Sequence, residues 1–351
     1  MRIGVALLIL WPTIVKGQAW NREAYPDYNP NLTNPDLTLV KFVSQTMRNT
    51  AGKPMTRRQA RAVAASAGLP DHVNNAETKY FPPVFNQDGG SCGSASRICY
   101  MFTHEINSYR DLNSSTAENN YPSHFVWLLT YGGSSKDDFV TNVGVPTSAT
   151  YGGRTYSRIY GNYDWDSDCF GWMQGYDKWL SAFSNRMTTP TQVPYNLGTE
   201  EGRLAAKAWL YNHAGDTSFK SGGLIGLGVA SGGNWQKIPQ TKQNDALGVT
   251  GKYYVKAWGT SVDHALTMVG YDDRIEFDLD ENGVFGEEDK DEVGAWIIVN
   301  SWGTGWCNGG FIYCPYAMGG PAVNSEGKLT DSGRVSSTIP ARTIARCAPS
   351  N

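Results

Sequence analysis

The order of the apolar runs along this 351-residue chain limits its fold class. Apolar residues at helical spacing come first, at residues 96–109 and again at 200–211. Short apolar runs typical of buried strands follow: GGLIGLGVA (222–230), DHALTMVGY (263–271) and AWIIVN (295–300). Because helices gather early and strands late, the sequence predicts an α+β protein with a helical half and a β-rich half.

The first nineteen residues predict a secretory signal peptide. Arg2 precedes an apolar run of about ten residues, and the segment ends in small residues at Gly17 to Ala19. The alternative is a short membrane anchor, but the run is too short to span a bilayer and is interrupted by Pro12. We therefore expect an exported protein, secreted or periplasmic, with no membrane span in the mature chain.

Charge and cysteine spacing exclude several classes of partner. The formal net charge is −3 and the pI is near 6.0, so the sequence indicates neither a nucleic acid nor an anionic membrane surface as a partner. Six cysteines permit disulfides in an exported protein but do not fix their pairing. No CxxC pair occurs, which argues against a zinc cluster. We expect the mature chain to be a monomer.

Two segments flank the predicted main body, which spans residues 69–317. Residues 20–68 contain two short helical patterns, the second of which stops at Gly68-Leu69-Pro70. This segment is either an N-terminal helical extension of the fold or a removable pro-segment. Residues 318–351 are rich in Gly, Ser and Thr, and we expect this tail to be partly disordered.

Three stretches far apart in the sequence carry side chains whose chemistry fits together. Cys92 would become a nucleophile as a thiolate if a helix N-terminus and the imidazolium of His264 lowered its pKa. The amide oxygen of Asn300 can hold the ring in orientation, with Trp302 covering that hydrogen bond from water. Gln87 can donate its side-chain NH to a developing oxyanion, beside the backbone NH of Cys92.

These residues resemble the papain-like cysteine peptidases, and the resemblance covers most of residues 69–317. The motifs that carry it are LPDHV (69–73), PPVFNQ (82–87), VDHALTMVGY (262–271) and IIVNSWGTGWCNGGFIY (297–313). The last block is long and specific. The resemblance implies a two-domain fold, in which the active site lies in a cleft between a helical domain and a β-rich, barrel-like domain.

The nucleophile motif departs from the family pattern. The signature C-G-[SA]-C-[WY] aligns literally with CGSAS (92–96), which puts Ala95 at the nucleophile position and Ser96 where an aromatic residue belongs. The competing register takes GSC (90–92) as the Gly-Ser-Cys step and makes Cys92 the nucleophile. Helix phase cannot choose between them, because a shift of three residues is nearly one turn.

The resemblance implies an exported cysteine endopeptidase, made as a zymogen, that acts on a protein or peptide through a thioester. The implied catalytic residues are Cys92, His264, Asn300 and Gln87. Substrate-binding residues are expected at Gly132, Gly133 and Trp302. The alternative is a catalytically inactive relative with Ala95 at the nucleophile position, which binds peptides or a partner in the same cleft. A third hypothesis keeps the thiol but transfers the acyl group to an amine.

An acidic insertion at residues 272–293 separates His264 from Asn300. It follows the D-x-[DN]-x-[DN]-G pattern of calcium loops, with an acidic residue at the twelfth position. The matching residues are Asp278, Asp280, Asn282, Gly283 and Asp289. The insertion is either a structural calcium site or a solvated acidic loop. No other cofactor is expected.

Overall fold

The structure is a computed structural model that describes residues 57–87, 89–130, 136–151, 173, 175–187, 195, 197–259, 262–318, 322–323, 329–330 and 347–349. The predicted signal peptide, most of the predicted pro-segment, and Gly132 and Gly133 lie outside the described residues. Within the described ranges, no helix is both long and apolar enough to cross a membrane.

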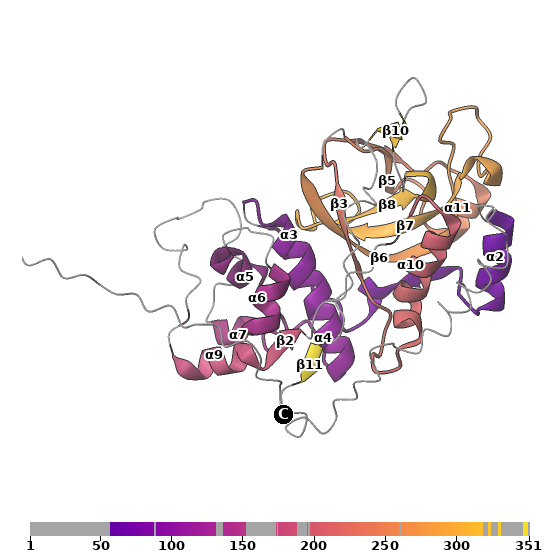
Figure 1. The fold of residues 1–351 in the computed structure, drawn as a ribbon. Helices are drawn as coiled ribbons and strands as arrows, with labels where there is room; N and C mark the ends of the chain where they lie inside the picture. Colours follow the sequence, from indigo (N-terminus) through magenta and orange to yellow (C-terminus); the bar gives the residue numbers. More distant parts are fainter. Residues whose placement is uncertain are drawn as a thin grey trace, which may run out of the picture. The chain divides into compact units, whose positions relative to one another are not determined.

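A seven-stranded sheet forms the β-rich part of the chain (Figure 1). Its strands, in order of adjacency, are β1 (His72–Asn74), β6 (His264–Glu276), β7 (Val293–Val299), β8 (Phe311–Pro315), β5 (Tyr253–Ala257) and β4 (Asn234–Lys237), with β3 (Ile225–Val229) also paired to β6. The β5–β8 pair is parallel and the other pairs in the sheet are antiparallel. The three apolar runs predicted as buried strands are β3, β6 and β7.

Strand β7 shows why these runs are apolar throughout. All seven of its residues are buried. Trp296 and Ile298 belong to one hydrophobic cluster, whereas Ile297 and Val299 belong to another, because successive side chains of a strand point to opposite faces. Covering on both faces produces an unbroken apolar run instead of an alternating one.

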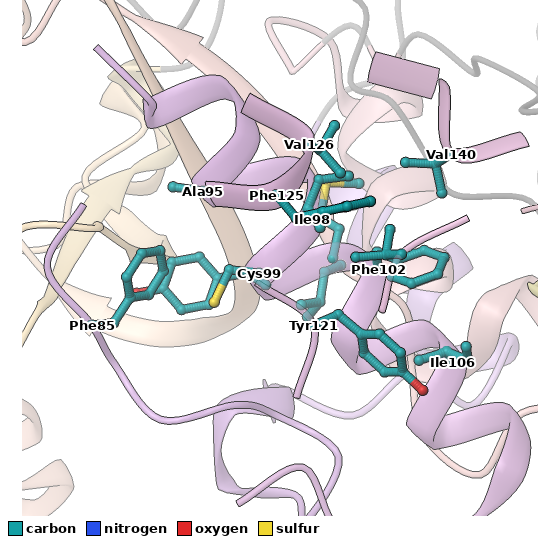
Figure 2. Close-up of a cluster of buried hydrophobic side chains, with 14 of the residues drawn as sticks. Phe85, Ala95, Ile98, Cys99, Phe102, Ile106, Tyr121, Phe125, Val126 and Val140 are labelled. Atoms are coloured by element: carbon teal, nitrogen blue, oxygen red, sulfur yellow. The ribbon is translucent and has the colours of Figure 1, made fainter. Parts of the chain in front are cut away.

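The helical part is built around one long buried helical stretch from Cys92 to Arg110. It consists of α3 (Cys92–Ser94), a π-helical segment (Ala95–Phe102) and α4 (Thr103–Arg110). Every residue of the π-helical segment is buried, and several of them pack with side chains from neighbouring helices in the cluster drawn in Figure 2. The sequence predicted a helix here at 96–109, and the structure confirms it with four more residues at its N-terminus.

Shorter elements complete the helical part. They are α5 (Ser123–Leu129), α6 (Lys136–Asn142), α7 (Ser148–Tyr151), α9 (Tyr176–Phe183) and β2 (Asn185–Met187), with the 3₁₀ turn Asn75–Glu77 leading in from β1. From the predicted tail, β11 (Cys347–Pro349) pairs with β2, and β9 (Ala322–Val323) pairs with β10 (Leu329–Thr330). Helices ahead of a mixed sheet confirm the predicted α+β class.

Two helices pack together on the side of the sheet that carries Trp296. Helix α10 (Glu200–Asn212) is capped by Thr199 and contributes Ala206 and Leu210 to the cluster around Trp296. Helix α2 (Arg57–Ser66) packs against α10 through a separate apolar cluster (Figure 1). That cluster comprises Ala60, Val63, Leu69, Leu204, Ala208 and Ala214. The remaining elements are α11 (Lys242–Leu247) and the 3₁₀ turns His213–Gly215, Glu288–Lys290 and Tyr316–Met318.

Candidate active site

The pairing of β6 with β7 brings His264 and Asn300 to the same edge of the sheet. Thr267 lies opposite Val299 in this antiparallel pair, so His264 at the start of β6 and Asn300 directly after β7 are diagonal neighbours. The His264 Nε2 atom is 2.8 Å from the Asn300 Oδ1 atom, and both residues are buried. Asn300 Oδ1 also accepts from the backbone NH of Ser301 at 2.7 Å. Because Asn300 Oδ1 can only accept, His264 Nε2 donates the hydrogen bond. The Nδ1 atom is then the ring nitrogen that remains for proton transfer.

Cys92 is the first residue of α3 and lies beside His264. Its thiol is free and partly exposed, and it is hydrogen-bonded to the His264 ring. Burial acts to raise the pKa of the thiol, but the hydrogen bond and positive charge of His264, with the backbone NH groups of Ala265 and Gly93, outweigh it and lower the pKa. The start of a long helix adds a favourable dipole for a thiolate.

The same interactions act in the opposite direction on His264. Burial acts to lower the pKa of its ring, but the hydrogen bonds to Cys92 and Asn300 and the charges of the thiolate and Asp263 raise it. A thiol with a lowered pKa beside an imidazole with a raised pKa shifts the balance of the pair toward the thiolate–imidazolium form. This is the protonation state that a cysteine nucleophile needs.

The two registers of the nucleophile motif give different contacts with His264. Cys92 touches the ring, whereas Ala95 is fully buried within the hydrophobic cluster of the helical part (Figure 2). The π-helical segment begins at Ala95 and holds more residues per turn than an α-helix does. All residues from Ala95 to Phe102 are buried in this structure, so the register with Cys92 at the ring is compatible with a well-packed helix.

Gln87 is fixed at both ends of its amide. Its Oε1 atom accepts from the Ser301 hydroxyl at 2.6 Å, and its Nε2 atom donates to the Gly89 carbonyl at 2.9 Å. The Gln87 backbone NH donates to the Ser301 carbonyl at 2.6 Å. An amide nitrogen carries two protons, so one remains for a ligand. Ser301 was not predicted as a site residue, although it stands between Asn300 and Trp302 in the long motif.

Trp302 covers the imidazole. Its ring centroid is 4.6 Å from that of His264, and it is 38% exposed, so it shields one side of the His264–Asn300 hydrogen bond from water. A small apolar hollow opens beside the two rings. Trp235, Trp258 and Trp306 line it with Val229, Ser231 and Leu266. These residues come from several strands and the loops between them, so sequence spacing alone could not group them.

The acidic insertion connects β6 to β7 and brings three carboxylates together. Oxygens of Asp278, Asp280 and Glu292 lie within 4.8 Å of one another, and Glu292 is fully buried. Glu292 takes the place that the pattern gave to Asp289, which is not part of this group. Lys290 also contacts Asp280, with Nζ 2.7 Å from Oδ2. The sequence pattern could not identify Glu292, because it lies three residues beyond the twelfth position of the loop.

Asn282, the remaining residue of the calcium pattern, stabilises the turn of this insertion. Its backbone NH donates to Asp278 Oδ1 at 3.0 Å, and its amide donates to Glu287 at 2.7 Å. Gly283 follows with a φ of 83°, a backbone conformation that glycine adopts without strain. The turn predicted from the pattern therefore forms, and calcium binding stays a proposal.

Residues 239–321 match the family model of the papain family cysteine protease. This segment contains His264, Asn300 and Trp302, whereas Cys92 and Gln87 precede it. The match confirms the resemblance to papain-like cysteine peptidases that the motifs indicated. No curated protein matches the chain in sequence.

Solved structures of similar proteins include three cysteine proteases or their precursors. The bromelain protease from Ananas comosus, in complex with the E64 inhibitor, is 17% identical with a TM-score of 0.43, covering 78% of this chain and 97% of that chain. Xylellain from Xylella fastidiosa is 14% identical with a TM-score of 0.42, covering 81% and 89%. Digestive procathepsin L 3 of the Tenebrio molitor larval midgut is 15% identical with a TM-score of 0.41, covering 76% and 70%.

Proposed function

We propose that this chain is an exported cysteine endopeptidase that hydrolyses peptide bonds through a thioester on Cys92. The observation that carries the proposal is the hydrogen bond between His264 and Asn300 at one edge of the sheet, with Cys92 beside the ring at the start of α3. A thiol held against an oriented imidazole, with a lowered pKa, is the arrangement that activates a cysteine for acyl transfer. The resemblance of residues 239–321 to the papain family supports the same reaction class.

The reaction follows from the groups around the thiol. The Cys92 thiolate attacks the carbonyl carbon of the substrate, and the oxyanion accepts from the Cys92 backbone NH and the free proton of the Gln87 amide. The His264 imidazolium then gives its Nδ1 proton to the leaving amine as the carbon–nitrogen bond breaks, and a thioester remains. Neutral His264 next takes a proton from water, the resulting hydroxide attacks the thioester, and the acid leaves with Cys92 restored as thiolate.

Alkylation of the purified protein tests the proposal directly. We expect iodoacetamide to modify Cys92 at mildly acidic pH, where ordinary thiols are protonated and unreactive, and the His264→Ala variant to react much more slowly. Mass spectrometry identifies the labelled residue. Cys307 serves as an internal control, since it is also a partly exposed free thiol but burial raises its pKa to about 11.

Peptidase assays on an unfolded protein substrate complete the test. Cys92→Ala should abolish hydrolysis, whereas Cys307→Ala should retain it. If Cys92 fails to react, or is recovered in a disulfide, the chain is the inactive relative with Ala95 at the nucleophile position. If an added amine appears in the product in place of water, the enzyme is an acyl transferase.

A further inference from the structure

The helical stretch that begins with Cys92 carries two buried hydroxyls in line with the thiol. Ser96 and Tyr100 follow Cys92 at intervals of four residues, so all three lie along one side of the helix. Ser96 is 5% exposed and Tyr100 is 1% exposed. The Ser96 hydroxyl reaches the strand that begins with His264, and the Tyr100 hydroxyl reaches Asn300 itself.

Ser96 ties the helix to the strand that begins with His264. Its hydroxyl donates to the Leu266 carbonyl at 2.8 Å and lies 2.7 Å from the Thr267 hydroxyl. A serine hydroxyl has one proton, so the Thr267 hydroxyl donates to Ser96. Leu266 and Thr267 are the second and third residues after His264 on β6.

The neighbouring strand leaves room for this contact. Gly226 on β3 lies opposite Thr267, and a Cβ atom there would be 3.6 Å from the Ser96 hydroxyl and 3.0 Å from the Met101 sulfur. A larger residue at this position would press on the helix beside Ser96. The glycine therefore permits the close approach of the helix to β6.

Tyr100 ties the same helix to the backbone of Asn300. Its hydroxyl donates to the Asn300 carbonyl at 2.9 Å, and its ring stacks on Phe81 with centroids 5.3 Å apart. One helix thus carries the nucleophile Cys92 and two side chains that fix its position. Ser96 binds β6, the strand of His264, and Tyr100 binds Asn300. Ser96 stands where the literal register expects an aromatic residue, and its short side chain brings the hydroxyl within hydrogen-bonding distance of β6.

We propose that Ser96 and Tyr100 are positioning residues that set the distance and angle between the Cys92 thiol and the His264 ring. The inference rests on the proposed function, because it assigns these residues to the same thiol and imidazole. Neither side chain would touch the substrate or the reacting atoms. Each would act by holding the helix against β6 and Asn300 during acyl transfer.

Four single variants test this role against plain stability. Ser96→Ala and Tyr100→Phe each remove one hydroxyl at the proposed anchors. Ser108→Ala and Tyr271→Phe are the matched controls. Ser108 is a buried serine on the same helical stretch, and its hydroxyl accepts from the Lys220 backbone NH. Tyr271 lies on β6, and its hydroxyl donates to the Pro70 carbonyl. All four lose a buried hydrogen bond, so all four should show a lower melting temperature.

The readout is the rate of Cys92 alkylation by iodoacetamide across pH, with kcat and KM measured beside it. In the two anchor variants, the alkylation rate at acidic pH and kcat should each fall about 5- to 30-fold, whereas KM should be nearly unchanged. A change of about one or two kcal/mol produces an effect of this size. The acid limb of the alkylation profile should move to higher pH. The two controls should keep the profile of the unmodified protein.

The outcomes separate this inference from the proposed function. If all four variants lose stability alike and Cys92 alkylation is unchanged in all of them, Ser96 and Tyr100 are structural residues and the inference is overturned alone. If Cys92 of the unmodified protein reacts only as an ordinary thiol, the proposed function and the inference are overturned together. A chain with no peptidase activity but with an acid-reactive Cys92 that the anchor variants impair would support the positioning role and contradict the proposed function.

Discussion

Replacing Asn300 with alanine removes the acceptor that orients the His264 ring. The hydrogen bond from Nε2 to Oδ1 is 2.8 Å long, and its partners are 8% and 1% exposed, so water does not readily replace the lost oxygen. When the ring is an imidazolium, a hydrogen bond to it contributes about 1.5–3 kcal/mol. We therefore expect kcat/KM for peptide hydrolysis to fall about 10- to 150-fold, since every 1.4 kcal/mol is tenfold.

The assay compares Asn300→Ala with Asn308→Ala, a change in the same loop. Asn308 accepts from the Tyr253 backbone NH at 2.7 Å and donates to the Tyr253 carbonyl at 2.9 Å, and it makes no contact with His264 among the hydrogen bonds of the described residues. Loss of the Asn308 side chain should destabilise the loop but leave the rate of peptide hydrolysis unchanged. Equal rates for both variants, together with an unaltered pH profile of Cys92 alkylation for Asn300→Ala, would refute the idea that this amide orients the ring.

Two further predictions concern charge. Asp263→Asn keeps an acceptor for the Ser231 backbone NH but removes a negative charge that raises the pKa of His264. Because the imidazolium is lost as pH rises through that pKa, the alkaline limb of the activity profile should move to lower pH. An alkaline limb that stays in place would contradict this prediction. Calcium should bind to the acidic insertion with a heat measurable by titration calorimetry, and Asp280→Ala should abolish it. No heat with the unmodified protein would mean that the insertion is a solvated loop.

The sequence predicted the main elements because their patterns are local. Buried runs at 222–230, 263–271 and 295–300 correspond to β3, β6 and β7, and the helix predicted at 200–211 is α10. Strand β6 extends beyond its predicted end to Glu276, where it pairs with Val293 of β7. That extension depends on a partner strand and not on the apolar run, so periodicity could not reveal it.

The site residues that lie within motifs could be predicted from the sequence. The site residues whose role depends on contacts between distant parts of the chain could not. His264, Asn300 and Trp302 meet in the structure as the motifs at 262–271 and 297–313 implied. Ser96, by contrast, acts on residues about 170 positions away, and a serine in a helix gives no sign of such a partner. The choice between Cys92 and Ala95 also depends on which residue lies beside His264, a contact across the chain that the helical spacing of apolar residues does not reveal.

The packing of α2 on α10 bears on limited proteolysis of this chain. Ala60 and Val63 cover Leu204 and Ala208, and Arg61 forms an ion pair with Glu288 of the acidic insertion. A cut after Gly68 would strip away this helix and leave an apolar groove open to water, which favours aggregation. Limited proteolysis should therefore stop ahead of Arg57, and the stable product should keep α2. A cut at the predicted end of the pro-segment, residue 68, would have removed this helix.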